Sequence, residues 1–294
     1  MRLLQGRPIA HGICASLKER VQAFFRRYNQ PPTLALLRVG DDAASGIYLK
    51  NKVQRAEEVG ICARVFAFPV QTSAAELIAC IDLLNHDDAT HGILVQLPLP
   101  APLGAETIIN AIAPAKDVDG LTTVTQGRLF RGEACLKPCT AQGILLLLKT
   151  VHADLTGQHV VILGRSLIVG RPTGLILLHE HCTITLAHSR SRDIAALCRQ
   201  ADIVIAAVGQ PRFVTRAFVR PGATVIDVGI TRETLSDGTQ KVIGDVDFED
   251  VASVAGVITP VPGGVGPMTV CCLMKNTIEA AENQMYGQET HAAV

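Results

Sequence analysis

The residues best suited to chemistry form a glycine-containing turn near the middle of the sequence. The apolar run 160–163 leads into Gly164-Arg165-Ser166, and Gly170-Arg171-Pro172 then precedes a second apolar run. This order predicts a buried strand, a tight loop and a helix. Such a turn points backbone N–H groups and the positive end of the helix dipole above the loop, which favours a phosphate group. Because the spacing is not Gly-x-Gly-x-x-Gly, a turn that binds no phosphate remains an alternative.

The residues after the next predicted strand indicate which nucleotide would bind. His188-Ser189-Arg190 follow that strand, about two dozen residues past Gly164, where an NAD-binding sequence usually carries an acid for the ribose hydroxyls. Here a hydroxyl and a cation stand instead, with Arg165 nearby. A 2′-phosphate needs donors and positive charge, so the pattern favours NADP over NAD. The alternative is two solvated surface arginines.

A second set of candidate residues lies nearer the N-terminus. Tyr48 and Lys52 are four residues apart in a predicted helix and therefore share a face. Gln96 ends a predicted strand and could lie opposite this pair. A lysine transfers protons near pH 7 only when burial or a neighbouring charge lowers its pKa. Taken alone, the Tyr–Lys pair is more simply interpreted as a solvated helix surface.

The elements that must position these residues alternate between strand and helix. We expect strands at 33–39, 61–68 and 92–97, and helices at 8–28, 74–84 and 106–112, with a further helix ending near Glu58 after turn and cap residues Gly40-Asp41-Asp42. A second series has strands at 159–163, 183–187, 203–207 and 224–228, and helices at 170–180 and 192–200. We expect 126–139 to be an irregular connection, a bridging helix to begin at 143–148, and a last helix at 270–282 with a disordered polar tail.

This alternation predicts an α/β fold with parallel sheets and two domains, the second of Rossmann type. Ligands in such sheets bind beyond the carboxyl ends of the strands. The polar clusters 40–52, 96–100 and 116–120 fall at those ends.

Composition limits the classes of function. The 294 residues carry no net charge, which argues against a nucleic-acid partner. No apolar run reaches the 18 or so residues of a membrane helix, and no signal peptide is evident, so we expect a cytoplasmic protein that does not associate with membranes. The nine cysteines include no Cys-x-x-Cys pair and are expected to be reduced. His179-Glu180-His181 lacks a third ligand, so no metal site is predicted.

Taken together, the motifs resemble the bifunctional methylenetetrahydrofolate dehydrogenase/cyclohydrolase (FolD) family over nearly the whole chain. The N-terminal matches are Val39-Gly40-Asp41-Asp42, Ala44-Ser45 with Tyr48 and Lys52, Gln96-Leu97-Pro98-Leu99-Pro100, and Lys116-Asp117-Val118-Asp119-Gly120. The later matches are Lys137-Pro138-Cys139-Thr140, Gly164-Arg165-Ser166, His188-Ser189-Arg190, Asp227-Val228-Gly229-Ile230, Gly244-Asp245-Val246-Asp247 and residues 260–269.

The resemblance implies oxidation of 5,10-methylenetetrahydrofolate with NADP, followed by hydrolysis of the methenyl product to 10-formyltetrahydrofolate. Tyr48 would stack on the folate, Lys52 would transfer protons, and Gln96 would orient Lys52. Asp119 would hold the amino edge of the pterin, whereas Asp117 is interpreted as a turn acid. The implied folate site also includes Leu97, Pro98, Pro262, Gly263, Gly264 and Val265. The implied NADP site comprises Gly164, Arg165, Ser166, Ser189, Arg190, Gly209 and Ile230.

The family further implies a homodimer with a folate-binding catalytic domain at 1–139 and 270–294 and an NADP-binding Rossmann domain at 140–269, the last helix packing back on the first domain. The chain departs from the family pattern at Gln5, Thr125, Ala141, Leu167 and Thr231. None of these replaces a proposed catalytic group. Alternatives are loss of one activity, use of NAD, a binding protein without catalysis, and a two-domain dehydrogenase of a small acid.

Overall fold

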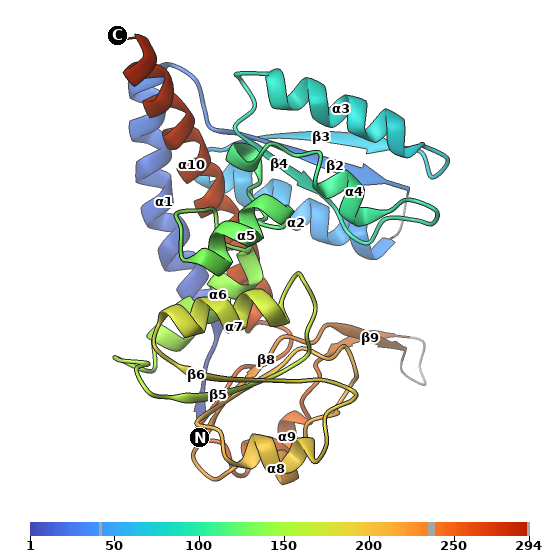
Figure 1. The fold of residues 1–294 in the computed structure, drawn as a ribbon, viewed down its shortest axis with the longest axis vertical. Helices are drawn as coiled ribbons and strands as arrows, with labels where there is room; N and C mark the ends of the chain where they lie inside the picture. The colour runs from blue at the N-terminus through green and yellow to red at the C-terminus, as the bar shows by residue number, and fades with distance from the viewer. Residues whose placement is uncertain (41–42, 235–238, 293–294) are drawn as a thin grey trace. The chain divides into compact units, whose positions relative to one another are not determined.

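The computed structural model describes residues 1–40, 43–234 and 239–292, which form two compact units (Figure 1). The first unit comprises His11–Cys139 and the chain from Val270 onward, and the second comprises Met1–Ala10 and Thr140–Thr269. Residues 1–10, which we expected in the first domain, are thus grouped with the second unit. Strand β1 (Arg2–Leu3) pairs in parallel with β11 (Val257–Ile258), so these residues extend the sheet of the second unit.

The first unit is built on a parallel sheet, as predicted, and its strand order is β3-β2-β4. Its strands are β2 (Thr33–Val39), β3 (Cys62–Phe68) and β4 (Gly92–Val95). Alternate residues of β2, such as Ala35 and Leu37, pack against Leu77 and Ile81 of α3 (Ala74–His86), together with α4 (Ala105–Ile109). The Ser73 capping box that begins α3 is present. Figure 1 shows α2 (Ala43–Val59) on the other face of the sheet.

Two long helices, α1 (Gly6–Tyr28) and α10 (Val265–Ala292), run side by side in the first unit, where Arg20 forms an ion pair with Glu282 at 2.5 Å. The last helix does pack within the first unit, but the expectation of a disordered tail after residue 282 was wrong, because α10 continues to Ala292. Gln284 anchors this extension by donating hydrogen bonds to the carbonyls of His91 and Ala115.

The segment 126–139, expected to be an irregular connection, instead begins within helix α5 (Thr123–Arg131). The Thr122 side chain caps its first turn, and Gly132, with φ of 72°, ends it. The helix was missed because only Thr125 and Leu129 are buried, which leaves almost no apolar period to detect. It is followed by α6 (Cys139–Lys149).

The second unit has a six-stranded parallel sheet with strand order β1-β11-β8-β7-β5-β6. The central strands, β5 (His159–Leu163), β7 (Ile203–Ala206) and β8 (Thr224–Asp227), are almost entirely buried, and β6 (Thr183–Ala187) forms one edge. Figure 1 shows α7 (Gly170–His179) on one face, with α8 (Ile194–Arg199) and α9 (Phe248–Ala252) on the other. The hairpin of β9 (Thr231–Thr234) and β10 (Gln240–Ile243) was not predicted.

Two short 3-10 turns complete the described elements, η1 (Pro114–Lys116) and η2 (Arg216–Phe218). None of the helices in the described residues combines the length and the apolar character that crossing a membrane requires.

Candidate active site

Lys52 and Gln96 are in direct contact in the first unit. The Lys52 Nζ donates a hydrogen bond to Gln96 Oε1 at 2.9 Å. Gln96 is buried just beyond β4; its backbone N–H continues the ladder by donating to the Leu37 carbonyl, and its Nε2 donates to the Leu97 carbonyl at 2.7 Å. With its Nε2 donating to this carbonyl, Gln96 presents its amide oxygen to the lysine. Tyr48, one helical turn before Lys52 on α2, is half-buried.

Burial and Asp119 act on the pKa of Lys52 in opposite directions. Burial lowers the pKa of Lys52 below its ordinary value, and the Asp119 carboxylate partly opposes that change. Burial likewise raises the pKa of Asp119, against the opposing effect of Lys52. The lowered pKa of Lys52 makes its amine easier to deprotonate than an exposed lysine, which favours proton transfer.

Asp117 folds the loop that carries Asp119. Its carboxylate accepts hydrogen bonds from the backbone N–H groups of Gly120 (3.0 Å), Leu121 (3.1 Å) and Thr122 (2.8 Å). Gly120 adopts φ of 72°, which glycine tolerates without strain. The interpretation of Asp117 as a turn acid is therefore confirmed, and this acid shapes the loop rather than facing Lys52.

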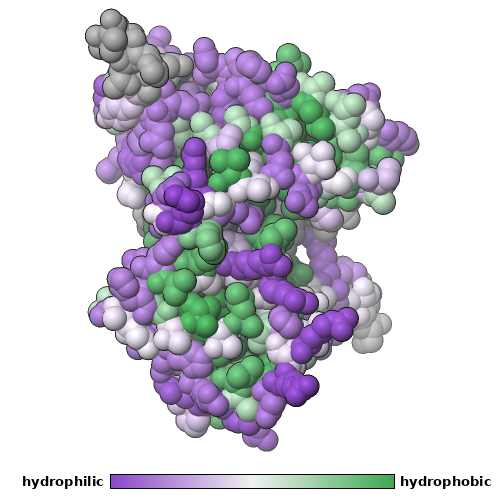
Figure 2. All heavy atoms as spheres, in the orientation of Figure 1, coloured by the Kyte–Doolittle hydropathy of each residue, from purple (hydrophilic) through white to green (hydrophobic). Residues whose placement is uncertain are grey.

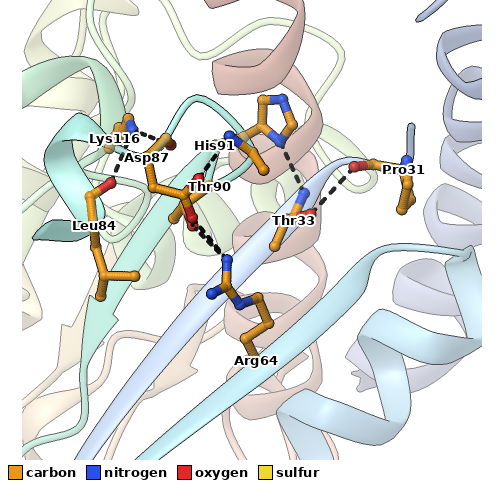
Figure 3. Close-up of polar contacts among 9 residues, drawn as sticks. Pro31, Thr33, Arg64, Leu84, Asp87, Thr90, His91 and Lys116 are labelled. Atoms are coloured by element: carbon orange, nitrogen blue, oxygen red, sulfur yellow. Dashed lines mark hydrogen bonds and ion pairs between the residues drawn. The ribbon is translucent and has the colours of Figure 1, made fainter. Parts of the chain in front are cut away.

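The start of this loop is fixed by the polar network in Figure 3. Lys116 is buried, and its Nζ donates to the carbonyls of Leu84 and Asp87, both at 2.9 Å, at the end of α3. Beside it, His91 Nδ1 accepts a hydrogen bond from the Thr33 N–H at 3.0 Å. Burial, with the nearby Lys116 charge, lowers the pKa of His91 to about 4. The lysine of the acidic loop is thus an anchor and not a surface charge.

Asn276 is a site residue that sequence reasoning missed. From α10, its Nδ2 donates to the carbonyls of Val118 and Lys137, each at 2.9 Å. The Cys139 thiol also donates to the Val118 carbonyl, at 3.2 Å. The residue directly before Asp119 is therefore held from two sides. The available signal was a polar residue within an apolar helical run, which usually means a buried hydrogen-bond partner.

The glycine turn of the second unit is closely packed. Gly164 has φ of 115°, and a side chain there would meet the Ala207 carbonyl oxygen at 2.2 Å. The Ser166 hydroxyl accepts from the N–H groups of Val169 and Gly170, so part of the α7 N-terminus bonds within the loop instead of facing outward. Ser166 therefore closes the loop, while the neighbouring Arg165 side chain stays exposed.

The ends of β5 and β6 bring the predicted phosphate-binding residues to one edge of the sheet. Gly164 follows β5, and its N–H donates to the Ala187 carbonyl, the last residue of β6. Ser189 and Arg190 come directly after that strand, and both are exposed. Between Ala187 and Ser191 the chain carries a hydroxyl and a cation but no carboxylate, so these residues fit a nucleotide with a 2′-phosphate.

The remaining predicted residues divide between the two units. Gly209 and Ile230 are exposed after β7 and β8 of the second unit, which also contains Pro262, Gly263, Gly264 and Val265. Leu97 and Pro98 belong to the first unit, as do Tyr48, Lys52, Gln96 and Asp119. The matches at Asp41 and Asp42 lie outside the described residues.

Fold and site together define a two-unit α/β protein in which one unit contains the hydrogen-bonded Lys52–Gln96 pair and the other a Rossmann-type parallel sheet. Family models match both parts: the catalytic domain of tetrahydrofolate dehydrogenase/cyclohydrolase over residues 4–119, and its NAD(P)-binding domain over residues 138–285. The chain therefore belongs to the tetrahydrofolate dehydrogenase/cyclohydrolase family.

Individual relatives support this family assignment. The chain is 51% identical to the bifunctional protein FolD of Cereibacter sphaeroides over 277 residues, which is 94% of this chain and 93% of the relative. It superposes on the crystal structure of FolD from Campylobacter jejuni with a TM-score of 0.92 at 42% identity, covering 96% and 99% of the two chains. The FolD of Trypanosoma brucei, solved with NADP cofactor and inhibitor, gives a TM-score of 0.91 at 36% identity, covering 96% and 98%.

Proposed function

We propose that this protein oxidises 5,10-methylenetetrahydrofolate to the 5,10-methenyl form with NADP and then hydrolyses that product to 10-formyltetrahydrofolate. The observation that carries the proposal is the Lys52 amine, hydrogen-bonded to Gln96 and made easier to deprotonate by burial. Family membership and the bifunctional names of the relatives support both activities.

The oxidation makes modest demands on the protein. The carbon that gives up the hydride lies between two nitrogens, whose lone pairs stabilise the cation that remains. NADP, when bound, accepts the hydride; the chain's own contribution is to hold the substrate in position. Tyr48 would stack on the folate ring, and Asp119 would bind the pterin's amino edge. Leu97 and Pro98, which belong to the same unit, would complete that site.

The hydrolysis needs proton transfer twice. Neutral Lys52 takes a proton from the water that attacks the methenyl carbon, giving a neutral adduct and an ammonium. The ammonium then returns a proton to the ring nitrogen as its bond to that carbon breaks, and the adduct's hydroxyl proton leaves as the formyl group forms. One proton is released overall, and Gln96 keeps the amine aligned throughout.

The residues proposed to hold NADP are Gly164, Arg165, Ser166, Ser189, Arg190, Gly209 and Ile230. Arg165, Ser189 and Arg190 would bind the 2′-phosphate, which gives NADP an advantage over NAD. The departures at Leu167 and Thr231 change none of these groups.

We also propose that the protein is a cytoplasmic homodimer. All nine cysteines, which lie within the described residues, are free, as expected in a reducing compartment. For the dimer, β6 is an edge strand, and Figure 2 shows apolar side chains gathered over α7 and β6. Leu178 and Leu186, which lie there, are 53% and 41% exposed. An unpaired edge with exposed leucines suits a second copy of this chain.

The test is a spectrophotometric assay of the purified protein with methylenetetrahydrofolate and either NADP or NAD, followed by hydrolysis of methenyltetrahydrofolate. We expect NADPH formation, a higher kcat/KM with NADP, and loss of hydrolysis in Lys52→Met with folate binding retained. Lys50→Met, an exposed lysine on the same helix, is the matched control. Absence of turnover with both cofactors would exclude a dehydrogenase, and hydrolysis at the wild-type rate by Lys52→Met would remove Lys52 from the mechanism.

A further inference from the structure

Two aspartates from the family-like motifs of the second unit have no role in the chemistry above. Asp227 ends β8 and Asp245 follows β10, and their side chains are 4% and 0% exposed. Asp227 Oδ1 accepts hydrogen bonds from the N–H groups of Gly229 and Asp245, both at 2.9 Å, and its Oδ2 accepts one from Val246 at 3.0 Å. The Asp227 carboxylate thus ties the end of β8 to the Asp245 segment.

Asp245 in turn holds a third segment. Its Oδ2 accepts hydrogen bonds from the N–H groups of Val208 at 2.6 Å and Gly209 at 2.9 Å, just beyond β7. A trans peptide points its carbonyl away from its N–H, so this carboxylate fixes the orientation of two successive peptide planes. The carbonyl of Ala207, in the first of these planes, lies against Gly164 of the predicted phosphate-binding turn.

The two carboxylates fit only because glycines adjoin them. A side chain at Gly229 would meet the Asp245 N atom at 2.4 Å, and one at Gly244 would meet Asp227 Oδ2 at 1.8 Å. Each aspartate therefore packs against a glycine of the other's motif. This mutual packing explains why the chain carries both Asp227-Val228-Gly229 and Gly244-Asp245-Val246, although one motif begins at the end of β8 and the other follows β10.

We propose that Asp245 is a positioning residue for NADP, setting the Val208–Gly209 backbone in the conformation that receives the cofactor while Asp227 holds Asp245 in place. The inference rests on the proposed function, since Gly209 is a proposed cofactor-binding residue. The carboxylate itself is buried beneath the loop, so its effect on NADP passes through the peptide planes that it orients.

The experiment compares the wild-type chain with Asp245→Ala and Asp245→Asn. Calorimetry would measure the Kd for NADP, hydrogen exchange on the cofactor-free proteins would follow residues 207–210, and the methenyl hydrolysis rate would be measured without nicotinamide cofactor. Two hydrogen bonds to a charged acceptor are lost in Asp245→Ala, so we expect the Kd for NADP to rise about tenfold to a hundredfold. Asp245→Asn keeps one acceptor oxygen and should lie between. Hydrolysis should be unchanged, and faster exchange should be confined to residues 207–210.

The matched control is Asp247→Ala, which removes a carboxylate from the same segment. Asp247 caps α9 and accepts a hydrogen bond from Asp250, not from the Val208–Gly209 loop, so its loss should leave the Kd for NADP within about twofold. If Asp245→Ala does not fold, Asp245→Asn alone must weaken NADP binding. An unchanged Kd in Asp245→Asn, or faster exchange across the whole second unit, would overturn the positioning role. A wild-type protein that binds no NADP would instead overturn the proposed function, and this inference with it.

Discussion

His91 should make the first unit sensitive to acid, and the size of the effect follows from its surroundings. The ring is 1% exposed, its Nδ1 accepts the Thr33 N–H, and it meets the edge of Phe24 with ring centroids 5.6 Å apart. Protonating the ring in the folded state would take this acceptor from Thr33 and place a second positive charge near Lys116. Burial with these neighbours lowers the pKa of His91 from 6.5 to about 4.

Whether stability rises or falls with pH depends on which state, folded or unfolded, binds the proton of His91 more tightly. The unfolded chain protonates His91 near pH 6.5, whereas the folded chain resists protonation down to about pH 4. Stability is therefore complete above pH 6.5 and falls as the pH drops between these values. One pKa unit corresponds to about 1.4 kcal/mol, so His91 alone should lower the free energy of unfolding by about 2 kcal/mol at pH 5 and about 3 kcal/mol at pH 4. This is a large part of the roughly 5–15 kcal/mol that stabilises a typical domain.

The measurement can be confined to the relevant unit. The sequence has no tryptophan, and its three tyrosines, Tyr28, Tyr48 and Tyr286, all belong to the first unit. Urea unfolding followed by tyrosine fluorescence therefore reports on the unit that contains His91. We would compare wild type with His91→Asn, whose amide oxygen can replace Nδ1 as the acceptor, and with His11→Asn at an exposed position of α1 as the control.

Between pH 7.5 and pH 5, the wild type and the control should lose about 2 kcal/mol more than His91→Asn. The variant's stability at pH 7.5 is expected to be lower, because the smaller side chain leaves a cavity, but only the change with pH tests the reasoning. Equal losses in all three proteins would show that His91 is not held neutral by burial.

Two further predictions concern the hydrogen bonds that position Lys52 and Asp119. Gln96→Leu removes the acceptor of the Lys52 amine and should lower kcat/KM for methenyl hydrolysis about tenfold to a hundredfold. Gln96→Glu adds a negative charge that raises the pKa of Lys52, so the pH–rate profile of hydrolysis should move to higher pH. Identical profiles for Gln96→Glu and the wild type would contradict the contact. Asn276→Leu leaves two buried carbonyls without this donor and should cost about 2–4 kcal/mol in urea unfolding monitored by tyrosine fluorescence, with exposed Asn283→Leu as the control. A loss no greater than that of the control would mean that other donors replace Asn276.

The sequence was most informative where local signals were strong. The apolar runs at 33–39 and 159–163 predicted their strands to the residue, and Ser73 with Glu76 predicted the start of α3. The Lys52–Gln96 contact was implied by the family resemblance of the two motifs that carry these residues, and the hydrogen bond between them is present.

What escaped prediction depends on contacts between distant segments. The pairing of β1 with β11 involves two residues on each side, too few for any periodicity. Asn276 reaches the carbonyl of Val118, 158 residues away, so no spacing could connect them. Lys116 lies in a sequence typical of a turn, and only the position of the carbonyls at the end of α3 shows that it is buried and hydrogen-bonded.

The chemistry proposed for Lys52 requires two opposing effects and would fail with either one alone. Burial by itself would hold the amine neutral, able to take a proton from water but poor at returning one to the ring nitrogen. Asp119 by itself would hold the amine charged, able to donate but unable to activate water. The structure supplies both effects, and residues other than Lys52 and Asp119 hold the carboxylate in place. Lys116, Asp117 and Asn276 hold the loop that presents Asp119, so the proton affinity of Lys52 depends on hydrogen bonds made well outside its own contacts.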